Sequence, residues 1–288
     1  MRKAILFALV AVMMAGCEKV IAEYDDEDYG ASAGDRDGNV VLVVRAGTAS
    51  TRAETVALSD VCGRLNVAVF DRDGKKVKTV SQVVSDAGFG TVSVSLADGD
   101  YQVVAVGHNG TGNATITSTE KVTFSNNKVT DTFCYYGDVS VTGNHQEFDI
   151  RLDRAVAMVR LKVDGETAKR NDVAQLKFYY IGGSSTLSPR EGYGCVNSKQ
   201  TEYRAWQDDG VYEVYTLPHS REDVITKMTV TAIDAGDNEI GECVIEDVPV
   251  VVNKVTNCTG NLFGSGTGGV NIGIAVDAEW DGEIDYRF

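Results

Sequence analysis

Alternation of apolar and polar residues is the feature of this sequence that most constrains its fold. In VSVSLADGDYQVVAV, residues 92–106, valine and leucine alternate with serine, the chain turns at Asp98-Gly99, and the alternation resumes. A period of two places successive side chains on opposite faces of a β-strand. Similar runs fill the chain, separated by Asp-Gly, Gly-Asp and Asn-Gly pairs, with only three prolines. The sequence therefore predicts an all-β protein with no helix longer than a few turns.

Two stretches predict β-hairpins. RLNVAVFDRDGKKVKTV, residues 64–80, has apolar residues on one face, the turn Asp73-Gly74, and a more polar return strand. VSVSLADGDYQVVAVGHN, residues 92–109, repeats this arrangement around Asp98-Gly99. An Asp-Gly pair between alternating runs favours a two-residue turn that joins antiparallel strands.

One long run changes its buried face. In EFDIRLDRAVAMVRLKV, residues 147–163, the apolar positions are even up to Leu152 and odd from Ala155, so the parity changes at Asp153-Arg154. Such a slip occurs at a bulge or where a strand passes from one core to another. We place a domain boundary around residues 143–147. The prediction is an N-terminal β-sandwich over 39–145 and a C-terminal one over 146–288.

The amino-terminal residues predict a secretory leader. Residues 1–16 have a basic start, an apolar stretch and the small residues Ala15 and Gly16 before Cys17. The apolar part is too short for a permanent membrane helix. Met-Ala-Gly-Cys resembles a bacterial lipobox, in which the cysteine thiol is lipidated and becomes the first mature residue. Several acyl chains on one residue give lasting membrane attachment. The alternative is an ordinary signal peptide in which Cys17 has no role.

An acidic segment follows the leader. Residues 17–38 are rich in aspartate and have little to bury, so they predict a solvated tether. The net charge of −15 becomes −17 when the two basic residues of the leader are removed. Such a charge argues against nucleic acid or an anionic lipid surface as a partner, because both are bound through clustered lysine and arginine.

The carboxy-terminal residues predict one more strand. GSGTGG, residues 264–269, reads as a flexible joint. After it, residues 270–288 alternate in one phase to the end of the chain. This strand either completes its own sheet, which we favour, or is offered to the sheet of another chain. Its apolar positions include Ile272, Ile274, Val276, Ile284, Tyr286 and Phe288.

The chemistry-bearing residues predict no enzyme. The five cysteines after Cys17 show no metal-ligand spacing, and buried, unpaired thiols are the favoured interpretation. The three histidines form no ligand pair, and no nucleophile motif is present. We expect no catalytic residue, metal, cofactor or small-molecule substrate. Trp206 and Trp280, with several tyrosines, could form a sugar-stacking face, but half-buried tyrosines on strands explain them more simply.

Five motifs in order give a family resemblance over essentially the whole mature chain: LNVAVFDRDGKKV (65–77), GDYQVVAVGHN (99–109), FCYYGDVSV (133–141), LDRAVAMVRLKV (152–163) and GYGCVNSKQ (192–200). The chain resembles the FimB-like fimbrial subunit lipoproteins of gut and oral Gram-negative anaerobes. That resemblance implies two tandem transthyretin-like β-sandwich domains, a palmitate-bearing lipoprotein in the outer membrane, other fimbrial subunits as partners, and a role in adhesion and biofilm formation.

The resemblance also gives meaning to residues 39–52. In related polymerising subunits a protease removes the first strand after an arginine, and a partner strand then fills the groove. Here the first strand is apolar throughout, including Val40, Leu42 and Val44, and suits a strand buried on both faces. Arg45 closes this strand, and Arg52 lies in a loop of small residues that a protease could reach. We favour an uncleaved anchor or accessory subunit. The alternatives are a stalk or tip subunit cut after Arg52, and a surface glycan-binding lipoprotein.

Overall fold

The computed structural model describes residues 38–47, 55–143, 145–163, 170–260, 262, 280 and 283–285. The predicted leader and acidic tether lie outside this range. The described residues are 62% strand and 3% helix, so the all-β class is confirmed. In chain order the elements are β1 (Val40–Gly47), β2 (Thr55–Ala57), η1 (Leu58–Asp60), β3 (Arg64–Phe70), β4 (Lys76–Val83), β5 (Thr91–Val94), β6 (Gly99–His108), β7 (Thr115–Ser118), β8 (Lys121–Thr123), η2 (Ser125–Asn127), β9 (Thr132–Val141), β10 (Gln146–Arg154), β11 (Ala157–Val163), β12 (Gln175–Ile181), β13 (Thr186–Ser188), β14 (Tyr193–Gly194), β15 (Lys199–Ala205), β16 (Val211–Thr216), β17 (Glu222–Ile233), β18 (Glu239–Val251), β19 (Val255–Gly260) and β20 (Glu283–Asp285).

The first part of the chain folds as a sandwich-like pair of layers. One layer contains β4, β3, β6 and β9, and the other contains β10, β1, β2 and β5. Among the described strands, the two layers are joined in one continuous sheet only where the last two residues of β10 pair with β9. Between them lies a core of small and branched apolar side chains, including Leu42, Leu65, Val103 and Leu152. This is the arrangement expected when alternating strands bury one face against each other.

The first predicted hairpin is confirmed. β3 and β4 pair antiparallel around the turn at Asp73-Gly74. Gly74 has φ of 77°, a conformation that costs glycine nothing. The side chain of Asp71 accepts the backbone N–H groups of Asp73 and Lys75 at 3.0 and 2.9 Å, which fixes the turn.

The second predicted hairpin is wrong. β5 pairs with β1, whereas β6 lies between β3 and β9. The last six residues of β6 are all buried, which suits a central strand with both faces covered. β5 buries only Val92 and Val94, one face of a short edge strand. Local alternation identified both strands correctly, but their partners are set by burial elsewhere in the sandwich.

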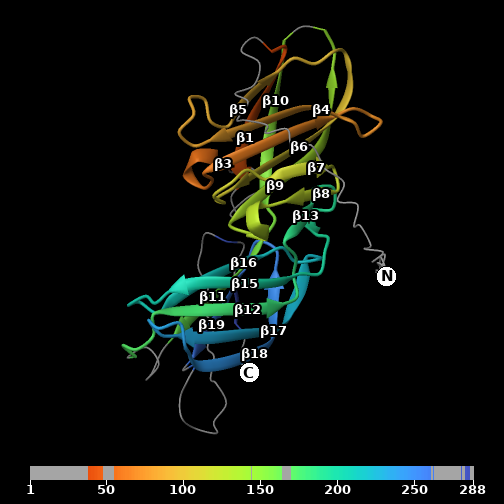
Figure 1. Cartoon of the computed structure of the whole chain (residues 1–288). Coiled ribbons are helices and arrows are strands. Elements are labelled where there is room, and N and C mark those ends of the chain that lie inside the picture. Colours follow the sequence, from red (N-terminus) through yellow and green to blue (C-terminus); the bar gives the residue numbers. More distant parts are fainter. Residues whose placement is uncertain are drawn as a thin grey trace, which may run out of the picture. The chain divides into compact units, whose positions relative to one another are not determined.

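The second part of the chain forms two further four-stranded sheets. Their strand orders are β16-β11-β19-β20 and β15-β12-β17-β18. In Figure 1, β12, β17 and β18 run side by side in the second of these sheets. Apolar residues from both sheets, among them Leu161, Phe178, Tyr212 and Val230, form a single core cluster. A sandwich-like packing therefore occurs twice in the described chain.

The chain changes core where the sequence changes parity. Ile150 and Leu152 of β10 belong to the first core, and Val159 and Leu161 of β11 belong to the second. This confirms the inferred passage from one core to another at Asp153-Arg154. The division into domains at residue 145 stays a prediction; strand pairing places 146–154 with β1 and β9, in the first sandwich.

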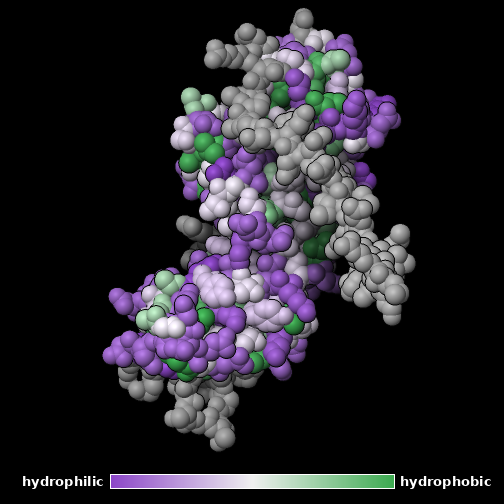
Figure 2. Space-filling view, viewed as in Figure 1, coloured by the Kyte–Doolittle hydropathy of each residue, from purple (hydrophilic) through white to green (hydrophobic). Residues whose placement is uncertain are grey.

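A small third sheet and a third cluster complete the fold. The sheet has the order β14-β13-β8-β7, so that Leu187 of β13 lies opposite Val122 of β8. The cluster combines residues from both parts of the chain, including Phe70, Leu217 and Trp280. Figure 2 shows the surface of one face, where hydrophilic side chains predominate and hydrophobic ones are scattered.

A buried polar network lies in the first sandwich. His108 is 1% exposed; its Nε2–H donates to the Asn66 carbonyl oxygen at 3.1 Å, and its Nδ1 accepts the Gly110 N–H at 3.0 Å. The Asn66 amide donates to the Ser81 hydroxyl at 2.8 Å. Burial, helped by the positive charge of Arg64, lowers the pKa of His108 to about 4. The imidazole is therefore neutral at physiological pH, as its acceptor role at Nδ1 requires.

Candidate subunit-binding strands

The predicted groove strand, β1, is held on both edges. Seven consecutive residues pair in parallel with β10, and the opposite edge pairs antiparallel with β5 and then with β2. The Val44 N–H donates to the Gly90 carbonyl at 2.7 Å. At the start of the strand, the Asn39 side chain donates to the carbonyl of Leu96 and accepts its N–H, both at 2.9 Å. β1 is therefore an interior strand of its layer.

One face of β1 is fully buried. Val40 and Leu42 are 0% exposed and Val44 is 3% exposed, and all three pack in the first core. The intervening Val41 and Val43 are only half-buried. The expectation of burial on both faces is therefore wrong for the second face: the other layer of the sandwich covers β1 from one side only.

Of the two arginines proposed as processing sites, the structure describes Arg45 but not Arg52. Arg45 lies within the strand, with its side chain on the outer face and 52% exposed, and its Nη1 is 3.2 Å from the Asp149 carboxylate of β10. A pair this exposed contributes little to stability. Arg52 lies outside the described residues, in the connection between β1 and β2. The lipidation candidate Cys17 also lies outside them.

The carboxy-terminal strand is described only in part. β20 pairs in parallel with β19, with Ile284 opposite Thr256. This pairing is within the protein's own sheet, the alternative we favoured. The other apolar positions named for this strand, Ile272, Ile274, Val276, Tyr286 and Phe288, lie outside the described residues.

Trp280, which precedes β20 in the chain, packs against an arginine and a tyrosine. Trp280 is 8% exposed, with the Arg154 guanidinium 3.8 Å from its ring centroid and the ring of Tyr215 at 6.5 Å. Arg154 also forms a two-pronged ion pair with Asp131, at 2.8 and 3.0 Å, and donates to Asn253 at 3.1 Å. The sequence analysis did not predict the contact between Arg154 and Trp280. The only signal in the sequence was that a charged residue, Arg154, lies where the apolar positions change parity. The arrangement combines a desolvated ion pair with cation–π packing.

The remaining side chains show little that is reactive. Among the described residues, no group of three histidine, cysteine or acidic side chains is placed to hold a metal ion. Cys62, Cys134, Cys243 and Cys258 are buried free thiols, whereas Cys195 is exposed. Burial raises the pKa of Cys62, Cys134 and Cys258 to about 12, so these thiols stay protonated and inert. No helix in the described range is long and apolar enough to span a bilayer.

Within the described part of the chain, no tryptophan stands exposed beside other aromatic residues as a sugar-stacking platform. A glycan-binding face requires an exposed tryptophan beside other aromatics, but Trp280 is buried and Trp206 is partly buried against the second core. Tyr180 and Tyr212 are core residues, and Tyr203 stands exposed on the sheet. The simpler interpretation of these tyrosines, as residues of the core and its margin, fits their burial.

These observations define a class: an all-β, sandwich-like protein whose candidate binding sites are strands. A family model described as fimbrillin-A associated anchor proteins Mfa1 and Mfa2 matches residues 32–285. The chain therefore belongs to this family, which confirms the resemblance to fimbrial anchor and accessory subunits. Membership makes the protein a subunit of a cell-surface fimbrium, a structural and adhesive class of protein.

Several solved structures are similar to this chain at low identity, and the first one described here shares its fold. A candidate adhesin from Bacteroides ovatus is 14% identical to this chain, with a TM-score of 0.53. The match covers 87% of this chain and 97% of the adhesin chain. The fimbrial anchor protein Mfa2 from Porphyromonas gingivalis is 15% identical over 70% of this chain and 80% of its own, with a TM-score of 0.40. The tip fimbrial protein Mfa3 from the same organism, with a C-terminal truncation, is 11% identical over 82% and 98%, with a TM-score of 0.43. Among curated proteins, none matches this sequence.

Proposed function

We propose that the protein is a lipid-anchored fimbrial subunit, an anchor or accessory protein that binds other subunits by β-strand addition. It attaches to the outer membrane through acylated Cys17 and serves a fimbrium used in adhesion and biofilm formation. The observation that carries this proposal is the match to the anchor family over residues 32–285, which lies downstream of a leader that ends in a lipobox-like Met-Ala-Gly-Cys. Lipidation supplies the membrane attachment that an anchor requires.

The packing of β1 supports an anchor that keeps its first strand. Burying a valine or leucine side chain contributes about 1.5–3 kcal/mol, so Val40, Leu42 and Val44 together contribute about 5–9 kcal/mol. That is comparable with the whole stability of a typical domain, about 5–15 kcal/mol. β1 therefore does not leave its place unaided. Exchange of this strand requires that the chain be cut and that an incoming strand refill the same pockets.

The decisive experiment changes the lipidation site. Cys17→Ala is expected to release the protein from the outer membrane and to change fimbria length. Cys195→Ala is the matched control, because it removes an exposed thiol of the folded part and should leave attachment intact. Unchanged membrane retention of the Cys17→Ala protein would refute the anchor proposal.

The alternative of a polymerising stalk or tip subunit makes a different prediction for the mature amino terminus. Cleavage after Arg52 would separate β1 from β2, which pair as neighbours across that connection. Amino-terminal sequencing of the protein purified from its native membrane distinguishes the two. An acylated start at Cys17 supports the anchor, and a start at Ala53 supports the processed subunit.

A further inference from the structure

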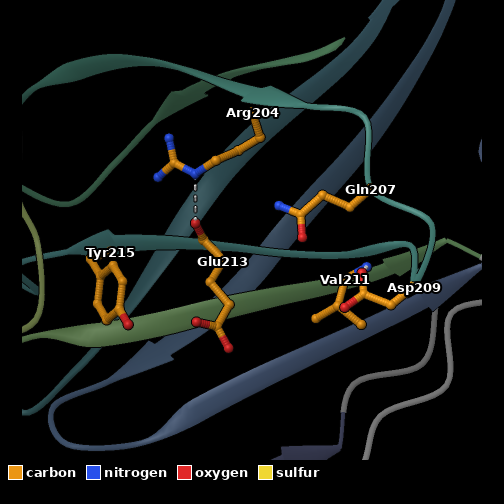
Figure 3. A pocket seen from close by; sticks show the side chains of 6 residues that line it. All are labelled: Arg204, Gln207, Asp209, Val211, Glu213 and Tyr215. Carbon is orange, nitrogen blue, oxygen red and sulfur yellow. Dashed lines mark hydrogen bonds between the residues drawn. The ribbon is translucent and has the colours of Figure 1, made fainter. Parts of the chain in front are cut away.

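The second sandwich has an open strand edge beside a pocket. β16 is the terminal strand of its sheet, with β11 on its inner side. A cavity of about 390 Å³ lies along it. Figure 3 shows the side chains that line this pocket, which come from β15, from β16 and from the turn between them: Arg204, Gln207, Asp209, Val211, Glu213 and Tyr215. We call this pocket and the edge of β16 from Val211 to Tyr215 the β16 groove.

Strand register shows which backbone groups face the groove. The Val163 N–H donates to the Gly210 carbonyl across the β11–β16 pair. In an antiparallel pair the hydrogen-bonded residues alternate, so positions 212, 214 and 216 bond to β11. Val211, Glu213 and Tyr215 therefore direct their N–H and C=O groups away from the sheet, into the groove.

Side chains, instead of a neighbouring strand, occupy part of this edge. The Arg204 Nε–H donates to the Glu213 carbonyl at 3.2 Å, the bond drawn in Figure 3, and the Tyr180 hydroxyl donates to the Tyr215 carbonyl at 3.0 Å. The Asp209 carboxylate accepts the Val211 N–H at 3.0 Å. Within the described residues, the outward N–H groups of Glu213 and Tyr215 have no such cap. A partly capped edge keeps its capacity for strand pairing.

We infer that the β16 groove is a second docking site, which takes an extended, basic segment of another fimbrial subunit by strand addition. Main-chain carbonyls of the segment would accept the N–H groups of Glu213 and Tyr215, and its side chains would fill the pocket. This inference rests on the proposed function and adds to it a site on the second sandwich, remote in sequence from β1.

The charge of the groove favours this occupant. Asp208 and Asp209 are exposed at the start of the groove, and neither forms an ion pair with a described residue. Arg204, by contrast, is paired with Glu202 at 3.0 Å, and Arg160 with Glu213 at 2.8 Å. Glu202 is also paired with Lys128 at 3.0 Å, so the carboxylates without an ion pair are those of Asp208 and Asp209 at the turn end of the groove, and they attract lysine or arginine at that end of the incoming segment. The same carboxylates would repel each other if the β16 edges of two copies met, so a second copy is the poorer occupant.

Position 213 offers a sharp test. Glu213→Pro removes an outward N–H while leaving the bonds from β16 to β11 in place, since residue 213 makes none of them. Glu213→Val is the matched control, because it removes the same carboxylate but keeps the N–H. The probe is a labelled peptide, Lys-Thr-Val-Thr-Val-Thr-Val-Lys, and its counterpart with glutamate at both ends.

The full chain is expected to bind the lysine peptide in a fluorescence anisotropy titration and the glutamate peptide at least fivefold more weakly. Glu213→Pro should bind the lysine peptide at least fivefold more weakly than Glu213→Val, because both variants lose the same carboxylate and only the proline also loses the outward N–H. Hydrogen–deuterium exchange supplies a readout that needs no variant: the peptide should slow exchange at the Glu213 and Tyr215 amides and leave Val214 unchanged. Absence of peptide binding, or binding without this protection, would overturn the inference.

The partner is tested in fimbriate cells. A photocrosslinking amino acid at position 207, in the groove, is expected to form an adduct that mass spectrometry identifies as a fimbrial subunit. An adduct with a second copy of this chain would overturn the assignment of the partner. Membrane retention through Cys17 does not depend on this groove, so failure here leaves the Cys17→Ala test of the proposed function unaffected, and the reverse also holds.

Discussion

The buried imidazole of His108 predicts a loss of stability in mild acid. Its pKa of about 4 in the folded protein lies below the 6.5 of the unfolded chain, so between these values the unfolded state binds the proton more tightly. The stabilising effect is complete above pH 6.5 and is lost as the pH falls toward 4. For these two pKa values, the free energy of unfolding at pH 5 is about 2 kcal/mol lower than at pH 7.5.

Urea unfolding, followed by tryptophan fluorescence at pH 7.5 and pH 5, measures this loss directly. His108→Gln cannot titrate, so its stability should fall by about 2 kcal/mol less between the two pH values, whatever its stability at pH 7.5. His145→Gln is the matched control for the substitution itself, because it removes an exposed histidine outside the buried network. Equal losses in the unaltered protein and His108→Gln would refute the account of a neutral, hydrogen-bonded His108.

Three further predictions concern packing and reactivity. Leu42→Ala removes a fully buried side chain from β1 and should lower the free energy of unfolding by about 2–5 kcal/mol in urea titrations; a loss below 1 kcal/mol would contradict the burial of this strand. Arg154→Met leaves the carboxylate of Asp131 without its ion pair and should lower the free energy of unfolding by about 3 kcal/mol. It should also shift the fluorescence emission of Trp280 to longer wavelength. Unchanged emission would show that the stacking of Arg154 does not hold Trp280 in place. In native protein lacking residues 1–17, Ellman's reagent should label one thiol quickly, and Cys195→Ser should abolish that reaction; rapid labelling of a second thiol would disprove the burial of the other four.

Local sequence patterns predicted the positions of strands well. They predicted which strands pair only for strands that are close in the chain. The β3–β4 hairpin was predictable because its turn residues and both strands lie within one short window. The same reasoning failed for β5 and β6, because β5 pairs with β1. The partner of β5 depends on which strand of the sandwich has a free edge, and local alternation does not reveal this. Alternation specifies a face and says nothing about the neighbour.

The parity change at Asp153-Arg154 carried more information than a hairpin signal. It correctly located the passage between two cores, because a one-residue slip exchanges the faces of a strand. It did not reveal that Arg154 itself would meet Asp131 and Trp280, which come from distant parts of the chain. The open edge of β16 was equally invisible, because its significance depends on which strands are missing beside it.

The pairing of β1 with β10 also has a kinetic consequence. Val40 lies opposite Gln146, so the two strands come together only after the long intervening chain has closed into a loop. Contacts between residues so far apart in sequence form slowly compared with hairpins such as β3–β4. During folding, the place of β1 is therefore expected to fill late. Until β1 pairs with β10, a competing strand can occupy the place of β1, and a protease can reach the unpaired first strand.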